Sequence, residues 1–184
     1  CEEDHFRIQY LLPGLQLSNI WKLINKVDGE IEKKVTYAFS EKEGYLTSCP
    51  TNVGTGMRAS IMLHLPALVM INGINDMLKA ISKIGYVVRG FYGEGTEVMG
   101  NLFQVSNQIT LGLSEEEIID NLEKVNQQII NKEQKVRKDL LSNSKNQLED
   151  QAWRAYGKMK ESNSIEEKKE EEVKFLSLFC IFFL

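Results

Sequence analysis

The sequence predicts an α+β fold, with short strands in the first part of the chain and long helices after them. Three observations predict it: short alternating apolar runs bounded by glycine or proline, amphipathic stretches with apolar residues three to four apart, and a change to long charged helical patterns after Gly112. With 184 residues, 42% hydrophobic and 26% charged, the chain fits one globular domain with a real core.

The first elements are a strand and a helix. Residues 5–11 alternate apolar and polar side chains, which predicts a strand, and the Pro13-Gly14 pair ends it. Residues 17–34 place apolar side chains on one helical face, which predicts an amphipathic helix with Ser18 as its N-cap.

The middle of the chain alternates further short strands with one helix. Strand-like runs are predicted at residues 35–39, 44–48, 59–65, 86–90 and 101–112. Residues 66–85 predict a helix, because Pro66 is tolerated in a first turn and Gly85 provides a stop.

The last part of the chain is helical. Ser114 stands three residues before Glu117, a capping-box pattern that opens a long helix, and residues 146–160 predict a second one. We therefore expect one domain over residues 1–157. Residues 158–184 are first charged and then apolar, and they are expected to form a tail outside the fold.

Composition limits the partners and the compartment. The formal net charge of −4 gives no general attraction for nucleic acid. Three cysteines form no disulfide framework, so a cytoplasmic location is predicted. The apolar run 175–184 is about half of the ~20 residues that a membrane helix needs, so no membrane span is expected. The chain opens on Cys1 rather than methionine, which suggests a fragment.

One stretch in the middle of the chain calls for a functional explanation. Residues 47–60, TSCPTNVGTGMRAS, join Cys49 to Arg58 through a glycine-bearing turn. Glycines let backbone N–H groups approach an anion, and an arginine supplies a planar, permanently charged fork for phosphoryl oxygens. The stretch lacks the Gly-Lys-Ser/Thr of a P-loop, and taken alone it is more often only a turn.

Two other stretches strengthen the functional interpretation. Residues 2–7, EEDHFR, and residues 89–97, RGFYGEGTE, each combine an arginine with carboxylates near the end of a predicted strand. Each one alone is surface charge in most proteins. The repeated pairing of an arginine with a carboxylate or a thiol favours a site instead.

Together these three motifs resemble the catalytic domain of the ATP:guanidino phosphotransferases, the arginine and creatine kinase family. Within that family, GTGMRASIMLHLPAL, YGEG and NLFQVSNQITLGLSEEEII are most similar to the bacterial protein arginine kinases. The likeness runs from Glu2 to about Gly157. It implies a largely antiparallel sheet flanked by helices, the guanidino kinase catalytic-domain fold.

The resemblance also implies roles for individual residues. Those that contact the substrate guanidinium are Glu2, with the less certain role, and Glu3, Cys49 and Glu94. Those that hold the phosphates of ATP are Arg7, Arg58 and Arg89. The catalytic residues are then Glu94, Glu3 and Cys49, the last as a reactive thiolate. Either Glu3 or Glu94 is the base, and we favour Glu94.

The chemistry of the residues agrees with these implied roles. Two carboxylates can align a guanidinium by bidentate hydrogen bonds, and arginines can neutralise the transferring phosphoryl group. Mg²⁺ is expected to bind through the nucleotide and not through a protein cage. The two histidines, His5 and His64, lack the spacing of a zinc site, so no protein metal site is expected.

The predicted function is transfer of phosphate from ATP to arginine side chains of proteins. A kinase of free arginine or another small guanidine is the first alternative, and a truncated, inactive binding module is the second. A homodimer and a regulatory protein are the further partners considered. The resemblance also implies an arginine-bearing strand upstream of residue 2 and a phosphoarginine-binding segment after residue 157. Neither is present in the 184 residues, so the chain as written is expected to have little or no turnover.

Overall fold

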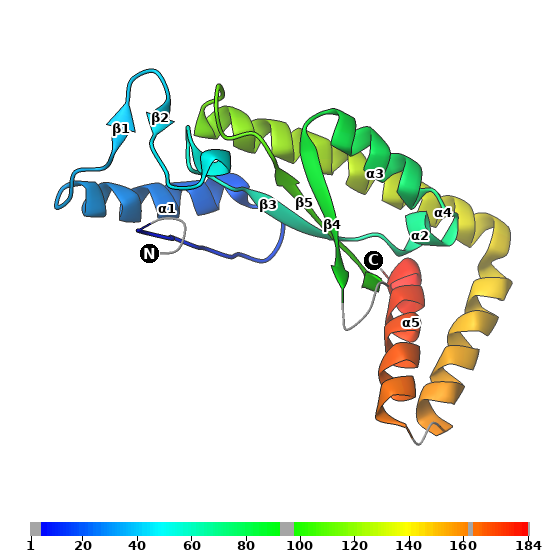
Figure 1. Ribbon diagram of the computed structural model, residues 1–184. Coiled ribbons are helices and arrows are strands. Elements are labelled where there is room, and N and C mark those ends of the chain that lie inside the picture. The colour runs from blue at the N-terminus through cyan, green and yellow to red at the C-terminus, as the bar shows by residue number, and fades with distance from the viewer. Residues whose placement is uncertain (1–4, 93–97, 162–163, 184) are drawn as a thin grey trace.

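The computed structural model, which describes residues 5–92, 98–161 and 164–183, has a small antiparallel sheet with helices packed on one face (Figure 1). The predicted α+β class with antiparallel strands and flanking helices is therefore confirmed. In chain order the elements are α1 (Leu17–Glu32), β1 (Phe39–Ser40), β2 (Gly44–Tyr45), the 3₁₀ turn η1 (Pro50–Asn52), β3 (Ser60–His64), α2 (Pro66–Met70), α3 (Ile74–Lys83), β4 (Tyr86–Tyr92), β5 (Val98–Asn107), α4 (Glu115–Glu161) and α5 (Ile165–Phe183).

The main sheet has the strand order β3-β5-β4, and both pairings are antiparallel. The register sets Val105 of β5 between Ile61 of β3 and Val88 of β4. One residue earlier in β5, Gln104 lies between Met62 and Arg89. Because successive side chains point to opposite faces, these two rows belong to opposite faces of the sheet.

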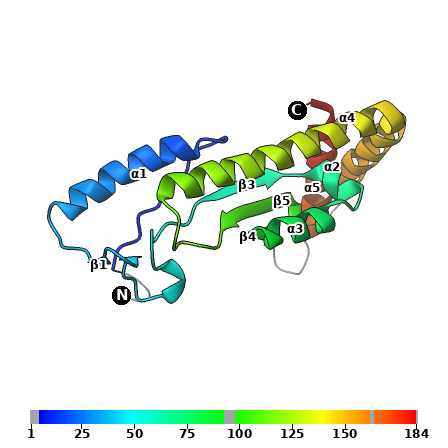
Figure 2. The ribbon, with the colours of Figure 1, turned by 90° about the horizontal axis from the view of Figure 1, so that it is seen from above.

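The row through Val105 faces the core. Val105 is 1% exposed, and the core residues around it come from the sheet and from α1, α2, α3 and α4: Leu17, Leu63, Leu65, Leu68, Ile74, Met77, Ile81, Phe103, Ile119, Leu122 and Ile129. In Figure 2, α4 runs along β3 on this side. The row through Gln104 is on the opposite face, where Met62 is 51% exposed and Arg89 is also exposed.

The predicted strand at residues 5–11 is wrong. These residues form an irregular segment with no strand pairing, and Phe6 (55%), Tyr10 (45%) and Leu11 (78%) are exposed. Their alternation is real, but a strand needs a hydrogen-bonded neighbour, and the part of the chain that the structure describes provides none beside them.

Helix α1 is confirmed, but its predicted cap is not. The helix begins one residue before Ser18, and Gln16 occupies the N-cap without a side-chain cap bond. The hydroxyl of Ser18 instead lies 3.5 Å from Glu123 Oε1 on α4. Trp21 Nε1 donates to Glu116 Oε1 at 3.2 Å, so polar contacts also hold α1 beside α4.

The predicted helix at residues 66–85 is two helices. Helix α2 ends because Asn72 adopts a left-handed conformation (φ 55°), and the Gly73 N–H then donates to the Leu68 carbonyl at 2.9 Å. This 6→1 bond is typical of a helix C-terminus. Helix α3 restarts at Ile74 and packs its apolar face on the sheet.

Helix α4 begins as predicted. Ser114 N donates to Glu117 Oε2 at 2.8 Å, and Glu117 N donates to Ser114 Oγ at 3.2 Å, so the capping box is present. The helix bends at Ser144, which has non-helical dihedral angles (φ −138°, ψ 23°). The two predicted helices are thus the two arms of α4.

The last segment differs from the expected tail. Helix α4 continues through Gly157, and α5 then folds back and packs against its second arm (Figure 1). Ile181 is 2% exposed, and the Tyr156 ring lies 5.5 Å from that of Phe175. Part of the apolar surface of α5 is covered because α4 bends at Ser144 and its second arm lies beside α5, although Leu176 and Phe179 stay 49% and 43% exposed. None of the helices that the structure describes is long and apolar enough to cross a membrane.

Candidate active site on the open face of the sheet

The stretch from Thr47 to Ala59, here called the glycine loop, is fastened to the end of β5 by two buried side chains. Thr110 is the first of them and is 8% exposed. Its Oγ1 lies 2.8 Å from the Val53 carbonyl oxygen and 3.0 Å from that of Thr51, and its own carbonyl accepts from Thr55 N at 2.8 Å. Thr110 therefore fixes the middle of the loop.

Asn107 fixes the loop's exit into β3. Its side chain is 6% exposed and satisfies three backbone groups. Oδ1 accepts from Ala59 N at 2.8 Å, and Nδ2 donates to the carbonyls of Met57 at 3.1 Å and Ile109 at 3.0 Å. The backbone on both sides of Arg58 is thus held by one amide group.

The sequence analysis identified neither Asn107 nor Thr110 as a site residue. Both lie in the run 101–112, which was predicted as a single strand, whereas β5 ends at Asn107. Nothing in that run marks these two polar residues as fastening points, because their partners are about 50 residues earlier in the chain.

Gly54 has to be a glycine because other backbone atoms pack closely against it. Its φ is +109°, and a Cβ atom there would lie 2.2 Å from the Thr110 carbonyl oxygen. Gly44 of β2 also lies close to Gly54. A Cβ atom on Gly44 would lie 2.6 Å from the Gly54 carbonyl oxygen. Gly56, with φ +61°, has no such close neighbour. Of the two glycines in the loop, Gly54 is therefore the one that close backbone packing requires.

Thr110→Val should lower the free energy of unfolding by about 1–3 kcal/mol, because it removes the buried hydroxyl and leaves two carbonyls without their donor. Urea denaturation measures the change. Hydrogen exchange at residues 51–55 should also become faster. Thr36→Val, on an exposed threonine, is the matched control and should change neither quantity. Equal effects of the two substitutions would contradict the fastening role of Thr110.

The face of the sheet opposite the core, which carries the row of Met62, Gln104 and Arg89, is here called the open face. Two of the three arginines assigned to the nucleotide lie on it or just before it in the chain. Arg89 lies on β4 and shares a cross-strand row with Gln104 and Met62. Arg58 stands two residues before Ser60, whose hydroxyl accepts from Gln104 Nε2 at 3.0 Å. Arg58 and Arg89 are both exposed. Their fixed positive charges give this face a preference for anions such as phosphate.

The remaining predicted site residues are placed less completely. Arg7 is exposed and lies on the irregular segment before α1. Glu2 and Glu3, within residues 1–4, and Glu94, within residues 93–97, lie outside the described residues. The structure therefore does not test the carboxylate half of the predicted site.

Cys49 stands at the start of the η1 turn and is half-buried. Its Sγ lies 3.0 Å from Thr51 Oγ1, while its carbonyl accepts from Thr47 Oγ1 at 2.7 Å and from Asn52 N at 2.9 Å. The thiol is thus held in a fixed position beside a hydroxyl. Its predicted contact with a substrate guanidinium stays a prediction.

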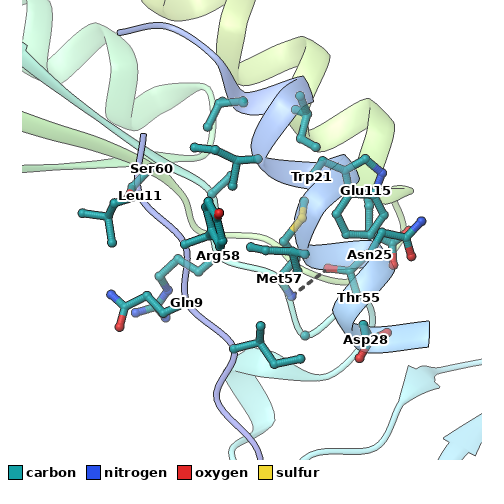
Figure 3. A pocket seen from close by; sticks show the side chains of 18 of the residues that line it. Gln9, Leu11, Trp21, Asn25, Asp28, Thr55, Met57, Arg58, Ser60 and Glu115 are labelled. Carbon is teal, nitrogen blue, oxygen red and sulfur yellow. Dashed lines mark hydrogen bonds between the residues drawn. The ribbon is translucent and has the colours of Figure 1, made fainter. Parts of the chain in front are cut away.

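A groove of about 1390 Å³ borders the glycine loop and β3. Figure 3 shows Arg58, Thr55 and Met57 of the glycine loop and Asn25 and Asp28 of α1 among the residues that line it. At the α1 end, Tyr37 Oη donates to Asp28 Oδ1 at 2.9 Å. Burial and this carboxylate raise the pKa of Tyr37 to about 12, so its phenol stays protonated near neutral pH.

Within the part of the chain that the structure describes, no three His, Cys, Asp or Glu side chains gather into a group able to hold a metal ion. The described polar residues of the row through Gln104 include Arg89, and Ser60 bonds to Gln104, with Arg58 two residues before Ser60. This donor set suits the phosphates of a nucleotide. A Mg²⁺ ion would then be held through those phosphates.

Comparison with known proteins identifies the family. The profile of the ATP:guanido phosphotransferase C-terminal catalytic domain matches residues 1–136. A protein from Desulforamulus reducens named protein-arginine kinase is 60% identical over 159 residues, which are 86% of this chain and 44% of that protein. The Bacillus subtilis protein of the same name is 54% identical over 176 residues, 96% of this chain and 48% of that protein. The chain thus spans about half the length of these relatives.

Solved structures support the same fold. The substrate-free duplicated taurocyamine kinase from Schistosoma mansoni superimposes with a TM-score of 0.54 at 28% identity, covering 64% of this chain and 15% of that one. Lombricine kinase superimposes with a TM-score of 0.52 at 29% identity, covering 63% of this chain and 31% of that one.

Proposed function

The chain belongs to the ATP:guanido phosphotransferase family, and from that premise we propose that it forms part of a protein arginine kinase. Such an enzyme transfers the γ-phosphoryl group of ATP to the guanidinium group of arginine side chains in proteins. The observation that carries the proposal is the identity of 54–60% with proteins named protein-arginine kinase over most of this chain. Identity with the taurocyamine and lombricine kinases is only 28–29%.

The arginines are proposed to bind and neutralise the phosphates of ATP. Phosphoryl transfer is catalysed mainly by positioning and by neutralising negative charge on the equatorial oxygens. Arg58 and Arg89 offer two permanent charges on one open face, and Arg7 is the third proposed contact. Because Asn107 holds the backbone on both sides of Arg58, the point from which that side chain extends is fixed. Bound Mg²⁺ would add further neutralisation of the phosphates.

The carboxylates are proposed to bind and deprotonate the substrate guanidinium. A guanidinium has a pKa far above neutral, so its neutral, nucleophilic form is scarcely populated at neutral pH. Glu3 and Glu94 are proposed to align the planar group by bidentate hydrogen bonds, and one of them accepts the proton as the N–P bond forms. Glu2 and Cys49 are the further proposed contacts of the cation.

The test is a labelling experiment with radiolabelled ATP. The 184-residue chain is incubated with either free arginine or an unfolded basic protein, and acid-labile phosphate is measured on each. We expect label on protein arginine when the remaining part of the Desulforamulus reducens relative is also present, and little or none with the 184-residue chain alone. Label only on free arginine would move the assignment to a small-guanidine kinase. Because the chain spans only half the length of its relatives, the assay is also run with the remaining part of the Desulforamulus reducens relative added. Absence of label in both arms would favour an inactive binding module.

A further inference from the structure

The glycine loop is held from two sides, and the contacts of Thr110 form only one of them. On the other side, β2 bonds to Gly54, a buried residue in the middle of the loop. Tyr45 N donates to the Gly54 carbonyl at 2.8 Å, and Gly54 N donates to the Tyr45 carbonyl at 3.2 Å. Gly44, beside Tyr45, has φ +77° and no room for a Cβ atom against Gly54. The close approach of β2 to the loop therefore depends on a glycine on each side.

The β1–β2 hairpin cannot hold this position by itself. Its strands have two residues each, and they form a two-stranded sheet separate from the main one. Phe39 of β1 is 57% exposed. An isolated two-stranded hairpin is only marginally stable in water. Contacts with another element therefore have to fix the hairpin in place.

Tyr37, two residues before β1, connects the hairpin to α1. Its Oη donates to Asp28 Oδ1 of α1 at 2.9 Å. Its ring meets the ring of Tyr45 edge-on, with the centroids 5.8 Å apart and an angle of 77° between the ring planes. Edge-on contacts between aromatic rings are favourable. A continuous path of contacts thus runs from Asp28 through Tyr37 and Tyr45 to Gly54.

Gly54 stands between the two proposed site residues of the loop, Cys49 and Arg58. On the Arg58 side, Met57 N donates to Thr55 Oγ1 at 3.2 Å, the bond drawn in Figure 3, so this part of the loop is also supported from within. Because Gly54 is close in the chain to both site residues, a shift of Gly54 would displace both of them. Phosphoryl transfer depends mainly on positioning, so such a displacement should slow the reaction.

We propose that Asp28 and Tyr37 are positioning residues of the candidate active site, because they hold the β1–β2 hairpin against Gly54. They thereby set the places of Cys49 and Arg58, although neither of them is assigned to ATP or to the substrate arginine. The inference rests on the proposed function, since it concerns the geometry of the same site. Its failure is distinguishable from failure of that function, because the decisive measurements use neither ATP nor arginine.

The first experiment is hydrogen exchange on the 184-residue chain and its Tyr37→Phe variant, which loses the hydroxyl and keeps the ring. Exchange at the amides of Tyr45 and Gly54 should become about 5- to 10-fold faster, the factor that corresponds to the loss of one hydrogen bond. Exchange at the buried Val105 of the main sheet should not change. Tyr156→Phe, on the second arm of α4, is the matched control. Unchanged exchange at Tyr45 and Gly54, or an equal acceleration at Val105, would overturn the proposal.

Variants at Asp28 test the other end of the same bond. Asp28→Ala removes the acceptor and should accelerate exchange at Gly54 as much as Tyr37→Phe does. Asp28→Asn keeps an acceptor oxygen and should restore most of the protection. Because the two residues act through one bond, the combined Tyr37→Phe and Asp28→Ala variant should exchange no faster than either single variant. Additive effects of the two substitutions would contradict a shared path.

The effect on the site itself is measured at Cys49, which is half-buried. More frequent opening of the loop in Tyr37→Phe should raise the rate of Cys49 alkylation by iodoacetamide at least about 3-fold. Cys180 on α5 is the internal reference and should react at an unchanged rate. Faster exchange at Gly54 with unchanged alkylation of Cys49 would overturn the positioning role and leave Tyr37 as a support of the hairpin alone.

The consequence for catalysis is measured under the conditions in which the labelling assay gives turnover. Tyr37→Phe and Asp28→Ala should each lower kcat by roughly 3- to 10-fold, with a smaller change in the KM for ATP. Asp28→Asn should recover most of kcat, and Tyr156→Phe should leave it unchanged. Unchanged kcat in both Tyr37→Phe and Asp28→Ala would overturn the proposal. Absence of turnover in the wild-type protein would instead count against the proposed function, because exchange and alkylation decide the positioning role without it.

Discussion

Glu133→Ala is expected to lower the free energy of unfolding by about 3–5 kcal/mol, because it leaves a buried cation and two backbone donors without their partner. Glu133 is 3% exposed. Its Oε1 accepts from Ala67 N and its Oε2 from Leu68 N, both at 2.9 Å, at the start of α2. Arg137 Nε donates to Oε1 at 2.9 Å. One carboxylate therefore caps α2 and neutralises Arg137.

The same arginine extends the connection to two other elements. Arg137 Nη1 donates to the Cys180 carbonyl of α5 at 3.2 Å, and Nη2 lies 3.4 Å from the His64 carbonyl at the end of β3. Loss of Glu133 should thus loosen α2, α4 and α5 together. Glu133→Gln should cost less than Glu133→Ala, because it keeps one acceptor oxygen.

Urea denaturation followed by circular dichroism measures these changes. The matched control is Asp150→Ala, which breaks an exposed ion pair of the same spacing, with Arg154 Nε 2.8 Å from Asp150 Oδ2. A surface pair contributes about 0–1 kcal/mol. Equal losses for Glu133→Ala and Asp150→Ala would contradict the bridging role of Glu133.

Arg89→Met is expected to lower kcat/KM for arginine phosphorylation by about 10²–10³-fold, the usual loss when one preorganised donor to a developing charge is removed. Arg89 is exposed on β4, so the folded state should be affected little. Arg89→Lys should lie in between, because an ammonium keeps the charge and loses the bidentate fork.

The measurement is made under the conditions in which the labelling assay gives turnover, with ATP varied at saturating protein substrate. The matched control is Lys83→Met. Lys83 is exposed at the end of α3, away from the open face, and its replacement removes one positive charge there. Equal effects of Arg89→Met and Lys83→Met would show that Arg89 does not contact the transferring phosphate. An effect on the KM for ATP with unchanged kcat would assign it to ground-state binding.

Much of the architecture could be predicted because its signals are local. The capping box of Ser114 and Glu117 lies within one helical turn, and the apolar alternation of β3 and β4 is visible within each strand. The left-handed Asn72 that splits one predicted helix in two is also marked in the sequence, by an Asn-Gly pair. That pair was treated as part of a helix, because the apolar periodicity continues on both sides of it.

The three motifs around Glu3, Arg58 and Glu94 were sufficient by themselves to determine the family, because so specific a set of residues at those intervals needs no folding to be recognised. Sequence alone also determined the α+β class and the beginning of α4.

Structural features that depend on contacts between residues far apart in the sequence were decided only by the tertiary structure. It showed that Gly54 is required by Thr110, 56 residues later, and that α5 (Ile165–Phe183) packs on α4. It also showed that no strand among the described residues forms a ladder with residues 5–11, although their pattern is that of a strand. The physical reason is that a side-chain pattern specifies a preferred local conformation, whereas a buried hydrogen bond or a strand pairing exists only when a second segment is brought to it.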